Sequence, residues 1–147
     1  MQILGFNFTK ISAEKFPDFK GKANAGINID FSNVKKEKLD LIKDLETYKS
    51  DFKLNISYSD IETKDKKTNS KLGEIIFGGN ILIGISKEDP KEVAKAFRSN
   101  EIPIKIKEFF LNFILTKCAT KALDLEDQLH LPLHIPFPQV KLQEKKE

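Results

Sequence analysis

Residues 81–113 have the sequence ILIGISKEDPKEVAKAFRSNEIPIKIKEFFLNF, and the spacing of apolar residues changes within this stretch. Up to Ile85 the apolar residues alternate with others or form short continuous runs, which is typical of β-strands. From Asp89-Pro90 onward they recur every three or four residues, which is typical of amphipathic helices. The chain therefore divides into a strand-rich part and a helical part that follows it.

Four β-strands are expected in the first part. Strict alternation of apolar and polar residues predicts three of them, and a richer apolar run predicts the fourth. They cover residues 4–8 with a possible continuation toward Phe16, residues 24–31, residues 52–59 and residues 72–85. Within the fourth strand, Gly78-Gly79 indicates a bulge, a sharp bend or a close approach by another backbone.

Two connections precede the fourth strand. Residues 34–49 contain Leu39, Ile42 and Leu45 at helical spacing, so they fit either a short amphipathic helix or a solvated connection. The lysine-rich residues 64–71 fit a solvated hairpin loop.

Two helices are expected in the second part. Asp89 and Pro90 suit a cap and a first helical residue, and the short helix that they begin extends to about Phe97. The main helix covers about residues 103–123. Because the strands precede the helices, the order predicts an α+β domain with a four-stranded antiparallel sheet, a long helix packed on it and a C-terminal extended Pro-rich arm.

The main helix carries apolar residues on two sides. One side holds Ile102, Ile106, Phe109, Phe110 and Phe113, and the roughly opposite side holds Leu111, Ile114, Leu115, Cys118 and Ala122. A helix on one sheet buries a single stripe, so a second apolar side predicts a second partner, and another subunit is the expected one. We therefore expect a homo-oligomer interface that includes Phe109, Phe113, Leu111, Leu115 and Cys118.

Residues 129–137, LHLPLHIPF, form the arm and alternate apolar residues with others. Pro132 and Pro136 exclude a regular helix. Two interpretations remain open for the arm: an edge strand or plug over the core of its own subunit, or the wall of a groove for extended apolar peptide. His130 and His134 are expected on the solvated edge of the arm.

Length, charge and cysteine content restrict the class of protein. The 147 residues suit a single domain over residues 1–142, followed by a charged, disordered tail at 143–147. The net charge of +3 does not indicate a nucleic-acid partner. A single Cys and an N-terminus without signal features predict a reducing, cytoplasmic location. No charge-free stretch of about 20 residues predicts insertion into a membrane.

No set of residues indicates catalysis, a metal or a cofactor. The two histidines are too few for a tetrahedral metal site, and Cys118 is expected as a buried structural thiol. Gly78-Gly79 lacks the Gly-Lys-Ser/Thr continuation of a phosphate loop. The expected function is therefore binding and not enzymatic chemistry.

Two short motifs carry a family resemblance. Asn100-Glu101-Ile102-Pro103 is similar to the Asn-Cys-Pro motif that precedes the long helix of SecB-like chaperones, with the Cys replaced. Phe137-Pro138-Gln139-Val140-Lys141-Leu142 is similar to the Phe-Pro-Pro/Gln-Leu-x-Leu segment that follows that helix in the family. With the order of strands, the chain over its whole length resembles the SecB-like family.

The resemblance implies an ATP-independent holdase that keeps unfolded or nascent polypeptides from aggregating, assembled as a dimer of dimers. It also implies delivery of clients in protein export or a role in toxin–antitoxin control. The mildly basic charge favours a generic or toxin–antitoxin holdase over a dedicated export chaperone.

Residues 124–131 are expected as an insertion between the long helix and the Phe-Pro segment. The implied peptide groove comprises Ile76, Phe77, Ile81 and Ile83 of the fourth strand and Leu133, Ile135, Phe137 and Val140 of the arm.

Two non-enzymatic alternatives remain. The apolar strands and long helix also fit a carrier of a small apolar ligand such as a lipid, which would be a monomer with an enclosed cavity. A simple interaction module is the other alternative.

Overall fold

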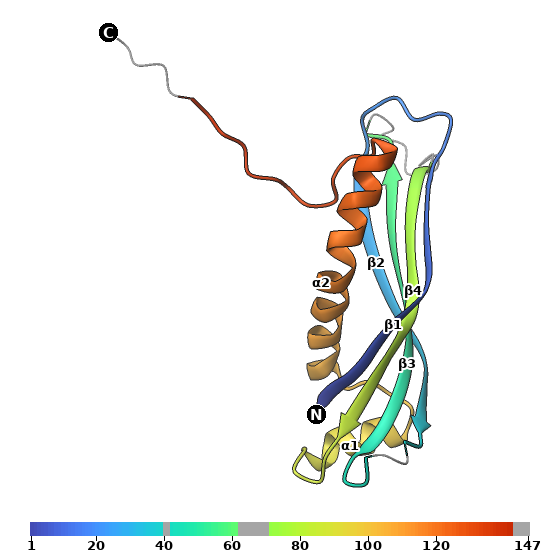
Figure 1. The fold of residues 1–147 in the computed structure, drawn as a ribbon, viewed down its shortest axis with the longest axis vertical. Coiled ribbons are helices and arrows are strands. Elements are labelled where there is room, and N and C mark those ends of the chain that lie inside the picture. The colour runs from blue at the N-terminus through green and yellow to red at the C-terminus, as the bar shows by residue number, and fades with distance from the viewer. Residues whose placement is uncertain (40–41, 62–70, 143–147) are drawn as a thin grey trace.

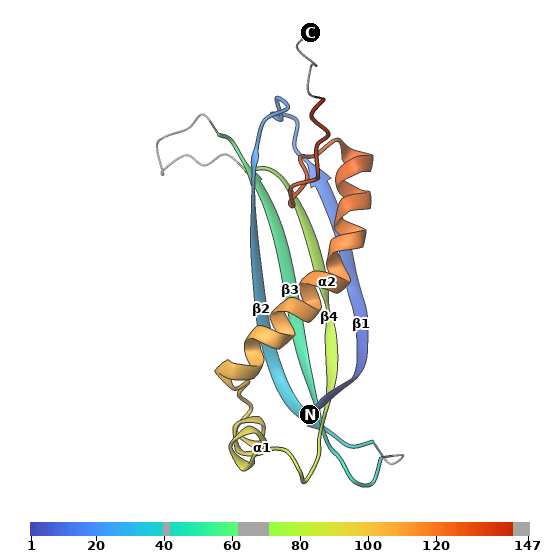
Figure 2. The same ribbon diagram turned by 90° about the vertical axis from the view of Figure 1, so that its left-hand side faces the viewer.

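The four predicted strands pair into one antiparallel sheet with the order β1-β4-β3-β2 (Figures 1 and 2). A computed structural model describes residues 1–39, 42–61 and 71–142. Its elements are β1 (Gln2–Lys15), β2 (Asn24–Glu37), β3 (Glu46–Ser59), β4 (Lys71–Ile85), α1 (Lys91–Arg98) and α2 (Ile104–Leu129). The predicted α+β class, with a long helix after the sheet, is confirmed.

The sheet is apolar on one face and polar on the other. Alternate residues of β3 and β4 are buried, as the period of two in their sequences predicts. Helix α2 covers this apolar face and crosses it diagonally from the side of β2 toward β1 (Figure 2). The core lies between them, and its fully buried side chains include Leu54, Ile56, Ile75, Phe77, Ile81, Ile83, Phe110 and Ile114.

Aromatic rings fill the middle of this layer. The ring of Phe6 stacks on Phe52 at a centroid distance of 5.2 Å and meets Phe113 of α2 edge-on at 5.6 Å. A Cβ on Gly79 would lie 2.0 Å from the carbonyl oxygen of Asn7 and 2.8 Å from the Phe52 ring. Glycine is therefore required where strand β1 and this ring approach β4, and the expected close approach of another backbone is confirmed.

The strands extend farther than the sequence pattern indicated. Strand β2 continues to Glu37 and β3 begins at Glu46, so much of residues 34–49 is strand, and the rest of this stretch that the structure describes is not helical. A bulge between Ser32 and Lys35 interrupts the alternation and explains why β2 was predicted too short. The predicted hairpin loop at 64–71 falls almost wholly on residues 62–70, outside the described part.

Both helices differ from prediction at one end. Asp89 does not cap α1: its carboxylate accepts hydrogen bonds from the backbone N–H and hydroxyl of Ser86 and pairs with the amino group of Met1. Helix α2 continues to Leu129, so residues 124–129 of the expected insertion are helical. The apolar spacing continues through Leu125 and Leu129, which pack against the core.

Candidate peptide-binding site

Helix α2 buries one winding stripe and not two opposite sides. Its buried residues are spaced four apart: Phe110, Ile114, Cys118, Ala122 and Glu126. Each step of four residues rotates about 40° beyond a full turn, so the stripe winds around the helix. The helix crosses a twisted sheet diagonally, and a winding stripe can therefore stay in contact with it. The prediction that Ile114, Cys118 and Ala122 lie opposite Phe110 is wrong.

This packing changes the surface that the helix offers to a partner. Cys118 is 1% exposed, and Phe113 and Leu115 are half-buried against the core. Leu111 is half-buried as well. Of the five residues expected at an oligomer interface, Phe109 alone is largely exposed, with 52% of its surface accessible.

The strand residues of the expected peptide groove belong mainly to the core. Phe77, Ile81 and Ile83 have no exposed surface, because they point from β4 toward α2. Ile76 points to the opposite, polar face of the sheet and is half-buried. Phe77, Ile81 and Ile83 therefore cannot contact a client while α2 stays on the sheet.

The arm leaves α2 through a left-handed turn. His130 has φ 53° and ψ 39°, and the backbone N–H of Leu131 donates to the carbonyl oxygen of Glu126 at 2.9 Å. This is a helix end closed by an αL residue. The side chain of Leu131 then returns to the core and packs at Gly73, where a Cβ would lie 3.2 Å from Leu131 Cδ2. The expected regular alternation over residues 129–137 is therefore absent.

A buried polar cluster fixes the base of the arm. Glu126 Oε1 accepts a hydrogen bond from the Tyr58 hydroxyl at 2.6 Å and one from the backbone N–H of His134 at 3.1 Å. The same oxygen lies 2.7 Å from His134 Nδ1. The side chains of Glu126 and His134 are 0% and 4% exposed. Burial, followed by the hydrogen bond to Glu126, raises the pKa of Tyr58 well above its usual range.

This cluster was not predicted, and the expected position of His134 on a solvated edge is wrong. A signal was present in the sequence: Glu126 continues the spacing of four that runs through Cys118 and Ala122. A carboxylate on a buried stripe needs a partner, and Tyr58 lies on the apolar face of β3. What the sequence did not reveal is that the arm turns back and supplies His134.

The cluster is suited to holding the arm and not to catalysis. Two acceptors would repel each other at 2.7 Å, so a proton lies between Glu126 Oε1 and His134 Nδ1. Tyr58 and Glu126 are fully buried, so no substrate reaches them. Glu126 Oε2 is also buried and has no hydrogen-bond partner in the described part of the chain. Through these contacts Glu126 joins β3 to the base of the arm.

Beyond this anchor the arm presents apolar side chains to solvent. It extends away from the sheet and helix (Figures 1 and 2). The exposed fractions of its large apolar residues range from 38% to 92%, and these residues are Leu133, Ile135, Phe137, Val140 and Leu142. The four residues expected in the arm half of the groove are among them. Contiguous exposed apolar residues of this kind typically mark a binding surface.

No family model and no curated protein sequence matches this chain. Its fold is similar to that of a SecB-like chaperone. That protein is Mycobacterium tuberculosis Rv1957, whose structure was solved in complex with a ChAD peptide from the Rv1956 HigA1 antitoxin. The TM-score is 0.53 at 12% sequence identity, and the match covers 97% of this chain and 92% of the other. The relationship is a distant one at the level of the fold.

Three further features concern the described residues. They contain no group of three or more His, Cys, Asp or Glu side chains placed to hold a metal ion. Burial raises the pKa of the Cys118 thiol to about 12. Within residues 1–39, 42–61 and 71–142, no helix combines the length and apolar character needed to span a membrane.

Proposed function

We propose that this protein is an ATP-independent holdase that binds unfolded or nascent polypeptides through its C-terminal arm. The observation that carries the proposal is an arm with five large exposed apolar residues, fixed at its base by a buried carboxylate–imidazole contact. An apolar segment of a client would bury its side chains against Leu133, Ile135, Phe137 and Val140. Each Å² of apolar surface removed from water contributes about 25 cal/mol, before the cost of ordering the client.

The fold similarity supports the same proposal. The neighbouring chaperone binds a peptide of an antitoxin. A role in toxin–antitoxin control is therefore the more specific form of the proposal, and a role in protein export is the alternative form. The carrier hypothesis receives no such support, because aromatic and aliphatic side chains pack the space between sheet and helix.

The test measures whether the protein suppresses aggregation of a chemically denatured client, such as citrate synthase, followed by light scattering without ATP. Suppression near a one-to-one ratio is expected for the natural chain. Phe137→Ser combined with Val140→Ser should remove most of it, because both side chains are exposed and leave the core and the anchor intact.

A matched control is Ile27→Ser combined with Ile61→Ser, which removes two exposed apolar side chains from the body of the protein. This variant should suppress aggregation as well as the natural chain does. The proposal is wrong if the natural chain leaves aggregation unchanged, or if the arm variant and the body variant behave alike.

We also propose a homo-oligomer, now centred on the first turns of α2. Ile104 is 87% exposed and Phe109 is 52% exposed, and their apolar surface suits contact with a second copy. Multi-angle light scattering should give a mass above that of one subunit. Phe109→Ser should lower this mass, and a natural chain that is monomeric at working concentration contradicts the proposal.

A further inference from the structure

A cationic hollow lies at the end of the molecule that carries α1, away from the arm. It has a volume of about 580 Å³ and is bounded by the end of β4, the start of β3 and one face of α1. Its floor is apolar, with Ile85 buried and Leu45 and Ala94 half-buried. Figure 1 shows α1 and the arm at opposite ends of the sheet.

Positive charge accumulates around this floor. The described residues of the lining include five basic side chains and three acidic ones, an excess of two in a chain whose total net charge is +3. Two of the three carboxylates are already paired within the protein. Asp89 pairs with the amino group of Met1, and Glu46 pairs with Arg98 and Lys36.

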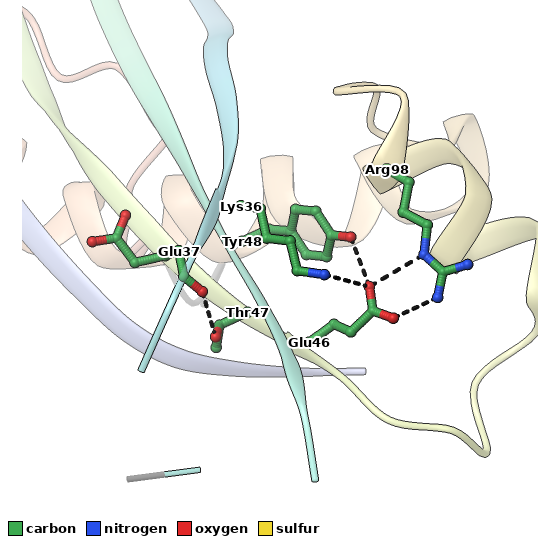
Figure 3. A network of polar contacts seen from close by, with 6 residues as sticks. All are labelled: Lys36, Glu37, Glu46, Thr47, Tyr48 and Arg98. Carbon is green, nitrogen blue, oxygen red and sulfur yellow. Dashed lines mark hydrogen bonds and ion pairs between the residues drawn. The ribbon is translucent and has the colours of Figure 1, made fainter. Parts of the chain in front are cut away.

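The pairing of Glu46 is shown in Figure 3. Nε and Nη2 of Arg98 donate to the two oxygens of the Glu46 carboxylate, and the Tyr48 hydroxyl donates to Oε2 at 2.9 Å. Such a bidentate contact provides a hydrogen-bond donor to each oxygen of the Glu46 carboxylate. Glu46 therefore contributes little toward neutralising the lysines. Within the described residues these lysines form no ion pair: Lys43, Lys87, Lys91 and Lys95.

Three basic side chains lie on one face of α1. Lys91, Lys95 and Arg98 follow one another at spacings of four and three, so like charges share one face. Like charges at these spacings repel each other. Lys95 and Arg98 lie in the last turn, where the helix dipole favours positive charge, and Arg98 pairs with Glu46. Lys91 lies in the first turn, where the dipole disfavours it, and neither Lys91 nor Lys95 has an ion-pair partner among the described residues, so both are free to meet an external anionic partner.

A second hollow adjoins the first. It has a volume of about 440 Å³, shares Lys43, Leu45 and Glu46 with the first, and adds Lys36, which pairs with Glu46, together with Lys38 and the acidic Glu37. Charge is thus spread over two adjoining hollows, which suits an extended chain better than a small anion. A lysine ammonium group is also a point charge on a flexible side chain. It lacks the planar, fixed set of donors with which an arginine guanidinium selects a single phosphate or carboxylate.

We propose that this cationic hollow binds an extended acidic segment of a partner polypeptide, separately from the apolar arm. The lysine ammonium groups would pair with its carboxylates, and the apolar floor would contact its aliphatic stems. Among the described residues that line the two hollows there is no aromatic side chain, so these residues offer no platform for stacking nucleic-acid bases.

The test measures binding of a fluorescein-labelled peptide of twelve glutamates by fluorescence anisotropy with the full chain. This probe has no apolar side chains for the arm, so the result is independent of the proposed holdase function. Lys91→Glu combined with Lys95→Glu should weaken binding at least tenfold. Lys20→Glu combined with Lys22→Glu makes the same charge change in the connection between β1 and β2, at the other end of the sheet, and should change the affinity less than twofold.

Three further measurements complete the test. Lys91→Gln combined with Lys95→Gln should also weaken binding, and circular dichroism should show both α1 variants folded. An oligothymidylate of equal charge should bind more weakly than the peptide. The proposal is overturned if the peptide does not bind at 50 mM salt, if the two charge-reversed variants lose affinity equally, or if the oligothymidylate binds as tightly as the peptide.

Discussion

Glu126 Oε1 lies 2.7 Å from His134 Nδ1, and this contact joins the last turn of α2 to the arm that follows it. Both side chains are buried. Since the arm packs only at its base and presents apolar residues beyond it, the direction in which those residues point depends on this contact. Stability and the proposed binding of clients are therefore connected at a single buried position.

Replacing His134 should show the strength of this anchor. His134→Ala leaves Glu126 buried with one partner fewer, and a lost partner of a buried polar group costs about 1–3 kcal/mol. We expect the free energy of unfolding, measured by urea titration with circular dichroism, to fall by about this amount. Tyr58→Phe removes the other side-chain partner of Glu126 and should lower stability similarly.

The control for the anchor is His130→Asn. His130 is exposed and adopts a left-handed backbone conformation that Asn also tolerates, so this variant removes the other histidine without affecting the cluster. Its stability should stay within about 0.5 kcal/mol of the natural chain. If the two histidine variants lose equal stability, the cluster does not hold the arm.

Gly79 should tolerate no side chain. The Cβ of Gly79→Ala would lie 2.0 Å from the Asn7 carbonyl oxygen, which is backbone and cannot rotate away. The two strands would have to separate locally, and we expect the free energy of unfolding to fall by at least about 2 kcal/mol. Gly26→Ala is the matched control, because nothing lies within 4 Å of its Cβ. It should be neutral or stabilise by up to about 1 kcal/mol, and equal losses in a urea titration would contradict the assigned strand pairing.

The Glu46 network should make stability depend on pH in the acid range. Hydrogen bonds from Arg98 and Tyr48 lower the pKa of Glu46 from 4.5 to about 2. A lowered pKa gives a contribution that is complete above pH 4.5 and is lost as the pH falls toward 2. The urea midpoint of Glu46→Gln should therefore lie below that of the natural chain at pH 6, and the two should converge near pH 2.

Glu37→Gln is the control for this pH dependence. Glu37 contributes its backbone carbonyl to Thr47, and its carboxylate points away from Arg98 (Figure 3). The difference between Glu37→Gln and the natural chain should be small and should not vary between pH 6 and pH 2. A constant difference for Glu46→Gln over the same range would show that the ion pair does not form in solution.

Cys118 should be chemically inert in the folded protein. Burial raises its thiol pKa to about 12, and 1% of the residue is exposed. Because the thiolate is the reactive form, iodoacetamide labelling in native buffer at pH 8 should be at least about 100-fold slower than in urea. Thr120→Cys in a Cys118→Ala background places a thiol on the exposed side of α2 and should label rapidly. Fast native labelling of Cys118 would show that α2 leaves the sheet readily.

The fold could be predicted largely from local patterns. The alternation in residues 52–59 and 72–85 identified β3 and β4, because one face of each strand packs on a core while the other does not. The direction of α2 across the sheet could not be predicted in the same way. A straight helical wheel separates Phe110 from Ala122, whereas a diagonal crossing over a twisted sheet buries both.

The candidate site was predicted in part. The apolar character of Leu133, Ile135, Phe137 and Val140 was visible in the sequence, and the structure leaves these side chains exposed. The sequence equally suggested Phe77, Ile81 and Ile83, which form the core instead. Apolar composition is the same for a buried strand and for a binding surface, so composition alone does not separate them.

The sequence by itself determined that four amphipathic strands precede two helices and that a proline-rich apolar segment follows, since periodicity and proline act over short stretches of chain. Only the tertiary structure decided which apolar residues stay in water and where Glu126 finds Tyr58 and His134. Those partners lie 68 and 8 residues away along the chain. Their contact depends on how α2 crosses the sheet and how the arm turns back at His130, and neither follows from local spacing.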